Sequence, residues 1–163
     1  MYMSDKVLKA LNDQFNFEMQ SGYLYLGMAG YCAAENMNGM AHFLTKQAYE
    51  EFGHAMKFFG YINEIDGRVT TQAMPEPRND FNSFLDCFKA ALEHEKKVTG
   101  RIYSILELAK EEKHYPTVEF LQWFVKEQVE EEANFRDIVF KLEKINESFQ
   151  GLMLLDKELG MRE

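Results

Sequence analysis

Six polar side chains interrupt apolar stripes that otherwise repeat at alternating steps of three and four residues. This spacing puts side chains on one face of a helix, so each interruption is expected to point toward a core. Carboxylate oxygens and imidazole nitrogens are donors that iron, manganese and zinc accept. The pattern therefore predicts a metal site inside a helical protein. The six residues, called the polar layer below, are Glu18, Glu51, His54, Glu95, Gln128 and Glu131.

The stripes lie in long segments that are predicted to be helices. Ser4 is a plausible cap for the first segment, and Gly67 is well placed to end the second. Pro116 is expected at the first position of the fourth segment. A short amphipathic helix is predicted after these four. The five predicted ranges are about 5–34, 39–66, 84–110, 116–145 and 149–159.

The connections between the predicted helices indicate how the helices are arranged. Links of about four or five residues join the first helix to the second and the third to the fourth, so each pair is expected to be antiparallel. Roughly 16 residues without clear periodicity separate the two pairs, and they reach roughly 50 Å when extended. A 28-residue helix is about 42 Å long, so this link can span the bundle. We predict an all-α fold over residues 1–163 as a single domain: a four-helix bundle with one long crossover between helices two and three, and a short fifth C-terminal helix.

The interruptions should meet at one height of this bundle. Each lies near the middle of its helix, and helices of similar length packed side by side have their middles level. A single glutamate in an apolar stripe is more often a snorkelling residue than a ligand. Four buried carboxylates at one level would repel one another and would be forced to bind protons, unless cations neutralised them. Interruption of all four stripes therefore favours a metal site.

Composition narrows the classes of protein that fit. The formal net charge is −9, which disfavours nucleic acid as the main partner and suits cations. No apolar run is long enough to predict a membrane span, and residues 1–6 do not predict a signal peptide. Cys32 and Cys87 lie on apolar faces, so we expect two reduced core thiols in a cytoplasmic protein rather than a disulfide.

A Glu-x-x-His motif at Glu51–His54, with single glutamates at Glu18 and Glu95, has the spacing found in di-iron carboxylate bundles. The corresponding run Glu131–Asn134 lacks the second histidine that many such bundles have. In these features and over nearly its whole length, the chain resembles the non-haem ferritins of bacteria and archaea. The segments that look most similar are Phe120–Glu132 and Leu154–Leu159.

The resemblance implies an intrasubunit di-iron centre. Its first iron site would comprise Glu18, Glu51 and His54, with Gln128 nearby. Its second would comprise Glu51 as a bridge, Glu95 and Glu131. A single histidine leaves the pair rich in oxygen donors, which favours reversible iron binding over a permanent cofactor. Bacterioferritins have a haem-binding methionine directly after the bridging glutamate, and Phe52 stands there in this chain, so no haem is expected.

Three further glutamates, Glu50, Glu127 and Glu130, flank the predicted ligands and are called the outer group below. A run of helical glutamates is usually a solvated acidic face. The resemblance to prokaryotic ferritins that have a third iron site implies instead that the outer group binds iron and shares Glu131 with the pair.

Aromatic and histidine residues outside the polar layer have two interpretations. Tyr25 follows Glu18 on the same stripe, and the resemblance implies that it donates a hydrogen bond and an electron to the centre. A packing role is the alternative for Tyr25, and packing is the role expected for Trp123. The remaining histidines lie off the stripes and are expected to be surface or packing residues. They are His42, His94 and His114.

The resemblance also implies a function. Ferritins of this kind act as ferroxidases: they oxidise Fe(II) to Fe(III) with O2 or peroxide and store it as a mineral. Storage implies a hollow homo-oligomeric cage of roughly 24 subunits. The fifth helix has an apolar face that needs a packing partner. The resemblance implies that this face packs around a symmetry axis of the cage. This face comprises Leu152, Leu155 and Leu159.

Three other classes remain open at this point. Another di-iron enzyme, such as a peroxidase or oxygenase, is disfavoured by the missing fourth-helix histidine. A non-enzymatic shell protein of the DNA-protecting kind would place its metal site between subunits, and this chain has no basic tail to hold DNA. A metal-free helical signalling bundle does not explain the interrupted stripes.

Overall fold

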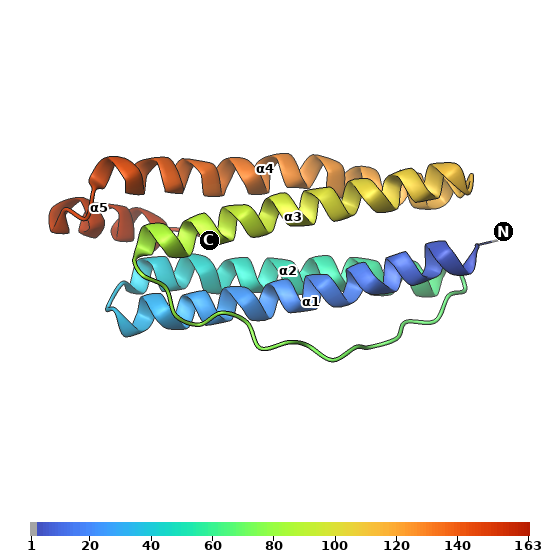
Figure 1. The fold of residues 1–163 in the computed structure, drawn as a ribbon, viewed down its shortest axis with the longest axis horizontal. Helices are drawn as coiled ribbons and strands as arrows, with labels where there is room; N and C mark the ends of the chain where they lie inside the picture. Colours follow the sequence, from blue (N-terminus) through green and yellow to red (C-terminus); the bar gives the residue numbers. More distant parts are fainter. Residues whose placement is uncertain (1–2) are drawn as a thin grey trace.

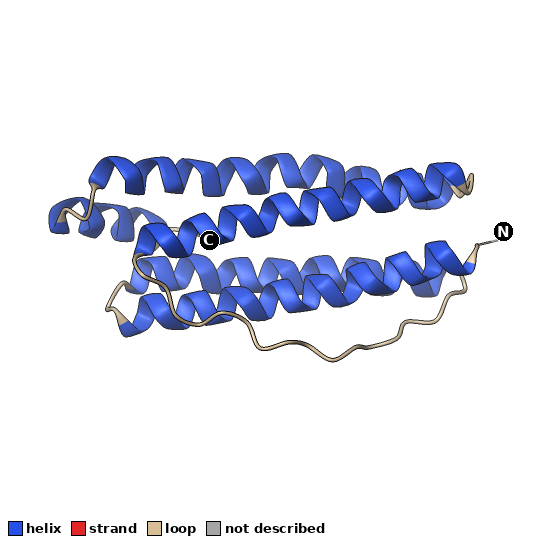
Figure 2. Ribbon diagram, viewed as in Figure 1, coloured by secondary structure: helices blue, strands red, loops and turns tan. Residues whose placement is uncertain are grey.

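The computed structural model describes residues 3–163, in which every regular element is a helix (Figure 2). Helices α1 and α2 form one antiparallel pair, and α3 and α4 form a second pair that lies against it (Figure 1). The predicted all-α bundle with a short fifth helix is confirmed. Across this range, no helix is apolar over enough of its length to cross a lipid bilayer. The five helices are α1 (Asp5–Ala34), α2 (Asn38–Glu64), α3 (Phe84–Glu111), α4 (Tyr115–Ile145) and α5 (Phe149–Leu159).

The crossover between α2 and α3 runs the length of the bundle, so α3 is parallel to α2 (Figure 1). Two buried asparagines of α1 hold it in place. The Asn12 amide donates to the Arg68 carbonyl at 2.9 Å and accepts from the Thr70 N–H at 2.8 Å. Asn16 donates to the Thr70 carbonyl at 2.8 Å and accepts from the Gln72 N–H at 2.9 Å. These side chains provide the hydrogen-bond partners that a neighbouring strand would give to the loop backbone. The link can therefore be long and ordered although its sequence has no helix or strand periodicity.

The start of α1 agrees with the predicted cap at Ser4, α3 has a serine cap as well, and the end of α2 differs from the prediction. Ser4 and Ser83 each accept a backbone N–H at the start of α1 and α3. The predicted end of the second helix at Gly67 is wrong, because α2 ends at Glu64. Asp66 adopts the left-handed conformation (φ 61°), and the Gly67 N–H donates to the Ile62 carbonyl at 2.8 Å. An aspartate tolerates this conformation, so the chain leaves the helix before the glycine.

Two apolar clusters fill the core, one toward each end of the bundle. On α1, one cluster includes Val7 to Phe17 and the other begins at Tyr25. On α3, one cluster ends at Leu92 and the other begins at Val98. The same gap recurs on α2 and α4, and the six residues of the polar layer lie in these gaps. The polar layer therefore separates two apolar halves at a single level, as the stripes predict.

Helix α5 folds back onto the end of the bundle. Leu155 and Leu159 are buried, and Leu152 packs against the same cluster. The expectation that these leucines form a face for a neighbouring subunit is wrong, because this chain already covers them. Asn146 and Glu147 both adopt left-handed conformations, which turn the chain back after α4. The exposed apolar side chains of α5 are instead Phe149, Met153 and Leu154.

Candidate metal centre

The polar layer contains two groups of ligand atoms that share one glutamate. Glu18 of α1 lies with Glu51 and His54 of α2, and one ligand atom from each is within 4.8 Å of the others. This is the first triad. Glu51 also lies with Glu95 of α3 and Glu131 of α4 under the same limit, and this is the second triad. All five residues are buried, so the four helices bring the predicted ligands together around Glu51.

The carboxylates of the layer hold protons more tightly than exposed carboxylates do. Burial raises the pKa of Glu18 well above its usual range, and the charge of Glu51 raises it further. Burial and the charge of Glu95 raise the pKa of Glu51 in the same way. Burial raises the pKa of Glu95, and burial together with Glu95 raises the pKa of Glu131 to about 8. The layer is therefore a place where bound protons or bound cations must offset the negative charge.

Glutamines one helical turn before Glu18 and Glu51 hold these carboxylates. The Gln14 amide donates to Glu18 Oε1 at 3.0 Å. The Gln47 amide donates to Glu51 Oε1 at 2.9 Å and to Glu131 Oε2 at 2.8 Å. Glu18 Oε2 is buried and has no hydrogen-bond partner among the described residues. An unpartnered carboxylate oxygen inside a cluster of acids is a free ligand position for a cation.

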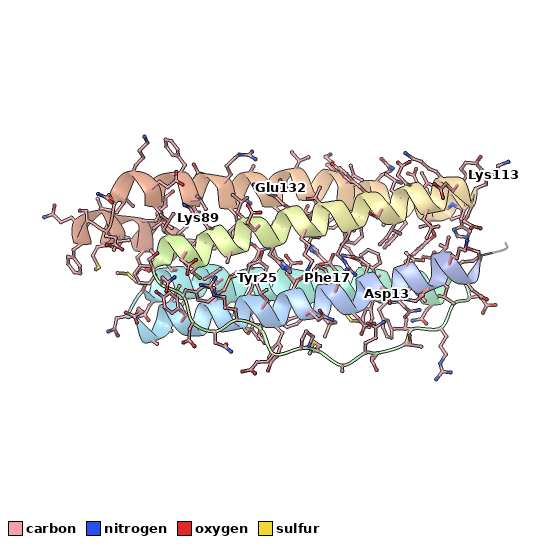
Figure 3. The ribbon with its side chains drawn as sticks, viewed as in Figure 1. Asp13, Phe17, Tyr25, Lys89, Lys113 and Glu132 are labelled. Carbon is pink, nitrogen blue, oxygen red and sulfur yellow. The ribbon has the colours of Figure 1, made fainter. Side chains whose placement is uncertain are left out.

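Glu95 is held by a tyrosine and a glutamine. The Tyr25 hydroxyl donates to Glu95 Oε1 at 2.5 Å, and Figure 3 shows Tyr25 on the side of α1 that faces α3. The Gln128 amide donates to Glu95 Oε2 at 3.1 Å and is also within 3.2 Å of the Thr99 hydroxyl. Gln128, which the resemblance places near the first site, is bonded here to a residue of the second triad. Helix α4 presents Gln128 to Glu95 in the second triad.

The outer group is not gathered into one site. Glu127 is half-buried and lies with His54 and Glu131 in a third set of ligand atoms within 4.8 Å of one another. Glu50 forms an ion pair with Arg162 of the C-terminal segment, with Glu50 Oε2 and Arg162 Nη2 3.0 Å apart. Glu130 is exposed. Of the three outer glutamates, the structure therefore places only Glu127 in a potential cation group.

The aromatic and histidine residues around the layer pack as expected. The Trp123 ring meets the edge of the His54 ring, with 5.4 Å between centroids. His94 stacks on Phe17 at 5.3 Å and lies 2.7 Å from the Ser21 hydroxyl. His114 bonds to Thr117, and His42 bonds to the Arg162 carbonyl. The two cysteines, Cys32 and Cys87, are buried free thiols.

Sequence reasoning missed three residues that support the ligands: Gln14, Gln47 and Arg101. A Gln-x-x-x-Glu spacing occurs on both α1 and α2, and this repeated spacing is the signal that could have identified the two glutamines. The Arg101 guanidinium donates from Nε to Gln14 Oε1 at 2.9 Å. Because Arg101 is 87 positions away in the sequence, no local pattern points to it.

Comparison with known proteins gives consistent matches. A family model described as a ferritin-like domain matches residues 8–145. A bacterial non-heme ferritin from Staphylococcus aureus (strain MRSA252) is 42% identical over 160 residues, which is 98% of this chain and 96% of that protein. Its counterpart in Staphylococcus haemolyticus (strain JCSC1435) is 39% identical over the same length. The crystal structure of an open pore ferritin from the hyperthermophilic archaeon Archaeoglobus fulgidus matches with a TM-score of 0.98 and 45% identity, covering 99% of this chain and 100% of that one.

Proposed function

The chain belongs to the ferritin family, and from this we propose that it stores iron and oxidises Fe(II) to Fe(III) at the polar layer. The observation that carries the proposal is the pair of triads that share Glu51. Two cations bound by such triads would be held about 3.5–4 Å apart, the separation that suits two-metal chemistry. The raised pKa values of Glu18, Glu51, Glu95 and Glu131 indicate that the layer needs compensating positive charge.

Each residue of the layer has a role in this proposal. Glu18 and His54 bind the first iron, Glu95 and Glu131 bind the second, and Glu51 bridges the two. When Fe(II) enters, these carboxylates give up their protons, because a cation replaces the proton as the compensating charge. Gln128 and Tyr25 hold Glu95 through hydrogen bonds to its two carboxylate oxygens. Anionic oxygen donors stabilise Fe(III) more than Fe(II), so the layer favours oxidation.

The oxidation balances with either oxidant. Two Fe(II) ions release two electrons as they become two Fe(III) ions. With two protons, these electrons reduce one O2 to one H2O2, or one H2O2 to two water molecules. Protons released from the carboxylates on iron binding are available for this step. Fe(III) then leaves the layer for a mineral.

The outer group extends the proposal. Glu127, with His54 and Glu131, forms a candidate third iron site beside the pair. Glu50 would join it only after release from Arg162, and the exposed Glu130 only after a side-chain rotation. Iron bound at this third site would be either on its way to the di-iron pair or on its way from the pair to the mineral.

Storage of a mineral needs an enclosed space, which one bundle does not provide. We therefore propose that copies of this chain form a cage of about 24 subunits, located in the cytoplasm.

The test is iron oxidation by the whole protein, comparing wild type with Glu51→Ala. Purified metal-free protein is loaded anaerobically with Fe(II), air is admitted, and near-ultraviolet absorbance is followed. Glu51→Ala removes a ligand from both triads, so we expect the fast phase to fall by about 100-fold or more. Glu64→Ala, which changes an exposed carboxylate at the end of the same helix, is the matched control and should keep the wild-type rate.

Two results would count against the proposal. If wild type oxidises iron no faster than buffer does, the layer is structural or binds another metal, and a non-enzymatic shell protein becomes the better description. If Glu51→Ala and Glu64→Ala oxidise iron at the wild-type rate, catalysis takes place elsewhere on the protein.

A further inference from the structure

A chain of two hydrogen bonds connects the bundle surface to the first triad. The Arg101 guanidinium of α3 donates from Nε to Gln14 Oε1 at 2.9 Å, and the Gln14 amide donates to Glu18 Oε1 at 3.0 Å. Gln14 and Glu18 are fully buried, while Arg101 is partly buried. The contact therefore links a charged group at the rim of the bundle to a proposed iron ligand.

Arg101 determines which way the Gln14 amide points. A guanidinium can only donate, so the Gln14 atom that faces it must be the carbonyl oxygen. The amide nitrogen must then face Glu18, where it can only donate. Glu18 Oε1 thereby accepts a hydrogen bond from the protein, and Oε2 remains as the oxygen without a hydrogen-bond partner.

The position of Arg101 is itself fixed by two other contacts with α1. Its guanidinium carbon lies 4.0 Å from the centroid of the Phe17 ring. Its Nη2 is 3.4 Å from the Asp13 carbonyl oxygen. Asp13 and Phe17 are labelled one turn apart along α1 in Figure 3. A flat guanidinium held on a ring face presents its Nε in one direction, which a flexible ammonium would not do.

We propose that Arg101 is a positioning residue for the first iron, acting through Gln14. It keeps Glu18 Oε1 bound to the protein, so Glu18 binds iron through Oε2 alone. This inference rests on the proposed function, because it concerns how the same layer binds its substrate. A one-oxygen contact leaves a coordination position on the first iron open for the oxidant.

Gln47, which stands one turn before Glu51 as Gln14 stands one turn before Glu18, has no arginine bonded to its amide among the described residues. Gln47 divides its amide between Glu51 Oε1 and Glu131 Oε2. Glu51 must bridge two metals and so must be free to adjust. Gln14 is bonded to Arg101 and serves only Glu18, which suits a ligand with a single fixed contact.

Anaerobic Co2+ binding to the metal-free protein tests the proposal, because calorimetry measures the affinity for Co2+ and its visible absorption reports the coordination number. Arg101→Met keeps a long apolar stem on Phe17 and removes the donor. We expect the tighter Co2+ site to weaken about 10–100-fold in calorimetry, the usual cost of losing a supporting partner of a metal ligand. The visible absorption of bound Co2+ should also fall, because Glu18 would bind through both oxygens and raise the coordination number.

Lys97→Met is the matched control. Lys97 is one turn from Arg101 on α3, and its ammonium lies 5.5 Å from the same Phe17 ring. The variant removes one positive charge near the same ring, but Lys97 does not bond to Gln14. We expect its Co2+ affinity to stay within about twofold of wild type, since exposed charges contribute little.

Gln14→Met and the double variant Gln14→Met/Arg101→Met test whether Arg101 acts through Gln14. If it does, the double variant binds Co2+ no more weakly than either single variant. Additive losses would overturn the proposal, and so would equal losses in Arg101→Met and Lys97→Met. Wild-type affinity and spectrum in Arg101→Met would overturn it while leaving the proposed function intact. Failure of wild type to bind two Co2+ ions per chain in the layer would instead refute both.

Discussion

The triad glutamates and two members of the outer group, Glu50 and Glu130, lie close together in sequence but differ in burial and in their hydrogen-bond partners. The triad glutamates are buried, and the neutral side chains Gln14, Gln47 and Tyr25 donate hydrogen bonds to them. Among the described residues, the one ring nitrogen in contact with them is His54 Nδ1, 3.2 Å from Glu51 Oε2 and itself a proposed ligand. In the outer group, Glu50 is 47% exposed and is bonded to a guanidinium of the chain itself.

This difference indicates what makes a group of acids into a metal centre. Neutral donors orient the triad carboxylates but leave their charge uncompensated, so compensation must come from protons or from bound metal. An exposed glutamate can obtain compensation from solvent ions or from a nearby arginine. Burial with neutral donors, rather than the number of glutamates, therefore separates the proposed catalytic pair from the acidic surface beside it.

Neighbouring glutamates of α4 give the sharpest test of this contrast. Glu131→Gln removes a buried ligand of the second triad, and we expect the initial rate of Fe(II) oxidation in stopped flow to fall by about 100-fold or more. Glu130→Gln changes an exposed member of the outer group, and its effect should be less than about fivefold. Equal losses in the two variants would show that burial does not distinguish the two regions.

The stability of the metal-free protein should depend on pH because of the buried region. Glu131 has its pKa raised to about 8 by burial and by Glu95, so the folded state holds a proton that the unfolded state releases. Stability is then lost as pH rises from about 6.5 to 8.5, by up to about 1.4 kcal/mol per pH unit for each such proton. His94, whose pKa burial lowers to about 4, has the opposite effect only below about pH 6.5, so its contribution is absent from this window.

Calorimetric melting at pH 6.5 and 8.5 measures this effect. Saturating Zn2+ should remove most of the decrease, because the metal replaces the protons as compensating charge. Glu131→Gln should reduce the decrease in the metal-free protein, whereas Glu130→Gln should leave it unchanged. A melting temperature that stays constant or rises over this window would mean that the layer is already ionised and compensated without metal.

Much of the fold and the meeting of the triads could be predicted from sequence, because both follow from regular geometry. Helical periodicity identifies the inward face, and similar helix lengths place Glu18, Glu51, Glu95 and Glu131 at one level. The long link predicts the parallel arrangement of α2 and α3. No knowledge of side-chain contacts was needed for any of these steps.

The missed features depend on contacts between distant parts of the chain. Gln14 looks like any polar helical residue until Arg101 of α3 is placed beside it. The ion pair between Glu50 and Arg162 requires the path of the C-terminal segment, which left-handed residues after α4 determine. The end of α2 at Glu64 depends on an aspartate that adopts a conformation usually associated with glycine.

Tyr25 allows a test with a smaller expected effect, at the hydrogen bond to Glu95 of the second triad. Tyr25→Phe removes one hydrogen bond to Glu95. We expect Fe(II) oxidation to slow by about tenfold, the lower end of the effect of losing a hydrogen bond to a charged group, which contributes roughly 1.5–3 kcal/mol. Tyr61→Phe is the matched control, because it removes a buried tyrosine hydroxyl that bonds to Thr117 and contacts no proposed ligand. Equal rates in the two variants would assign Tyr25 a packing role only.

The smallest predicted effect on metal binding comes from a change at Arg162, which is bonded to Glu50 of the outer group. Its guanidinium bonds to Glu50 Oε2 at 3.0 Å and to the Phe43 carbonyl at 3.0 Å, so it occupies the place of a cation beside Glu50. Arg162→Gln should free Glu50 and strengthen binding of a third Zn2+ ion by about two- to fivefold in calorimetry, the range for an exposed charge pair. The double variant Arg162→Gln/Glu50→Gln should lose this gain. Weaker binding of the third ion in Arg162→Gln would mean that Arg162 organises the outer group rather than competing with metal for it.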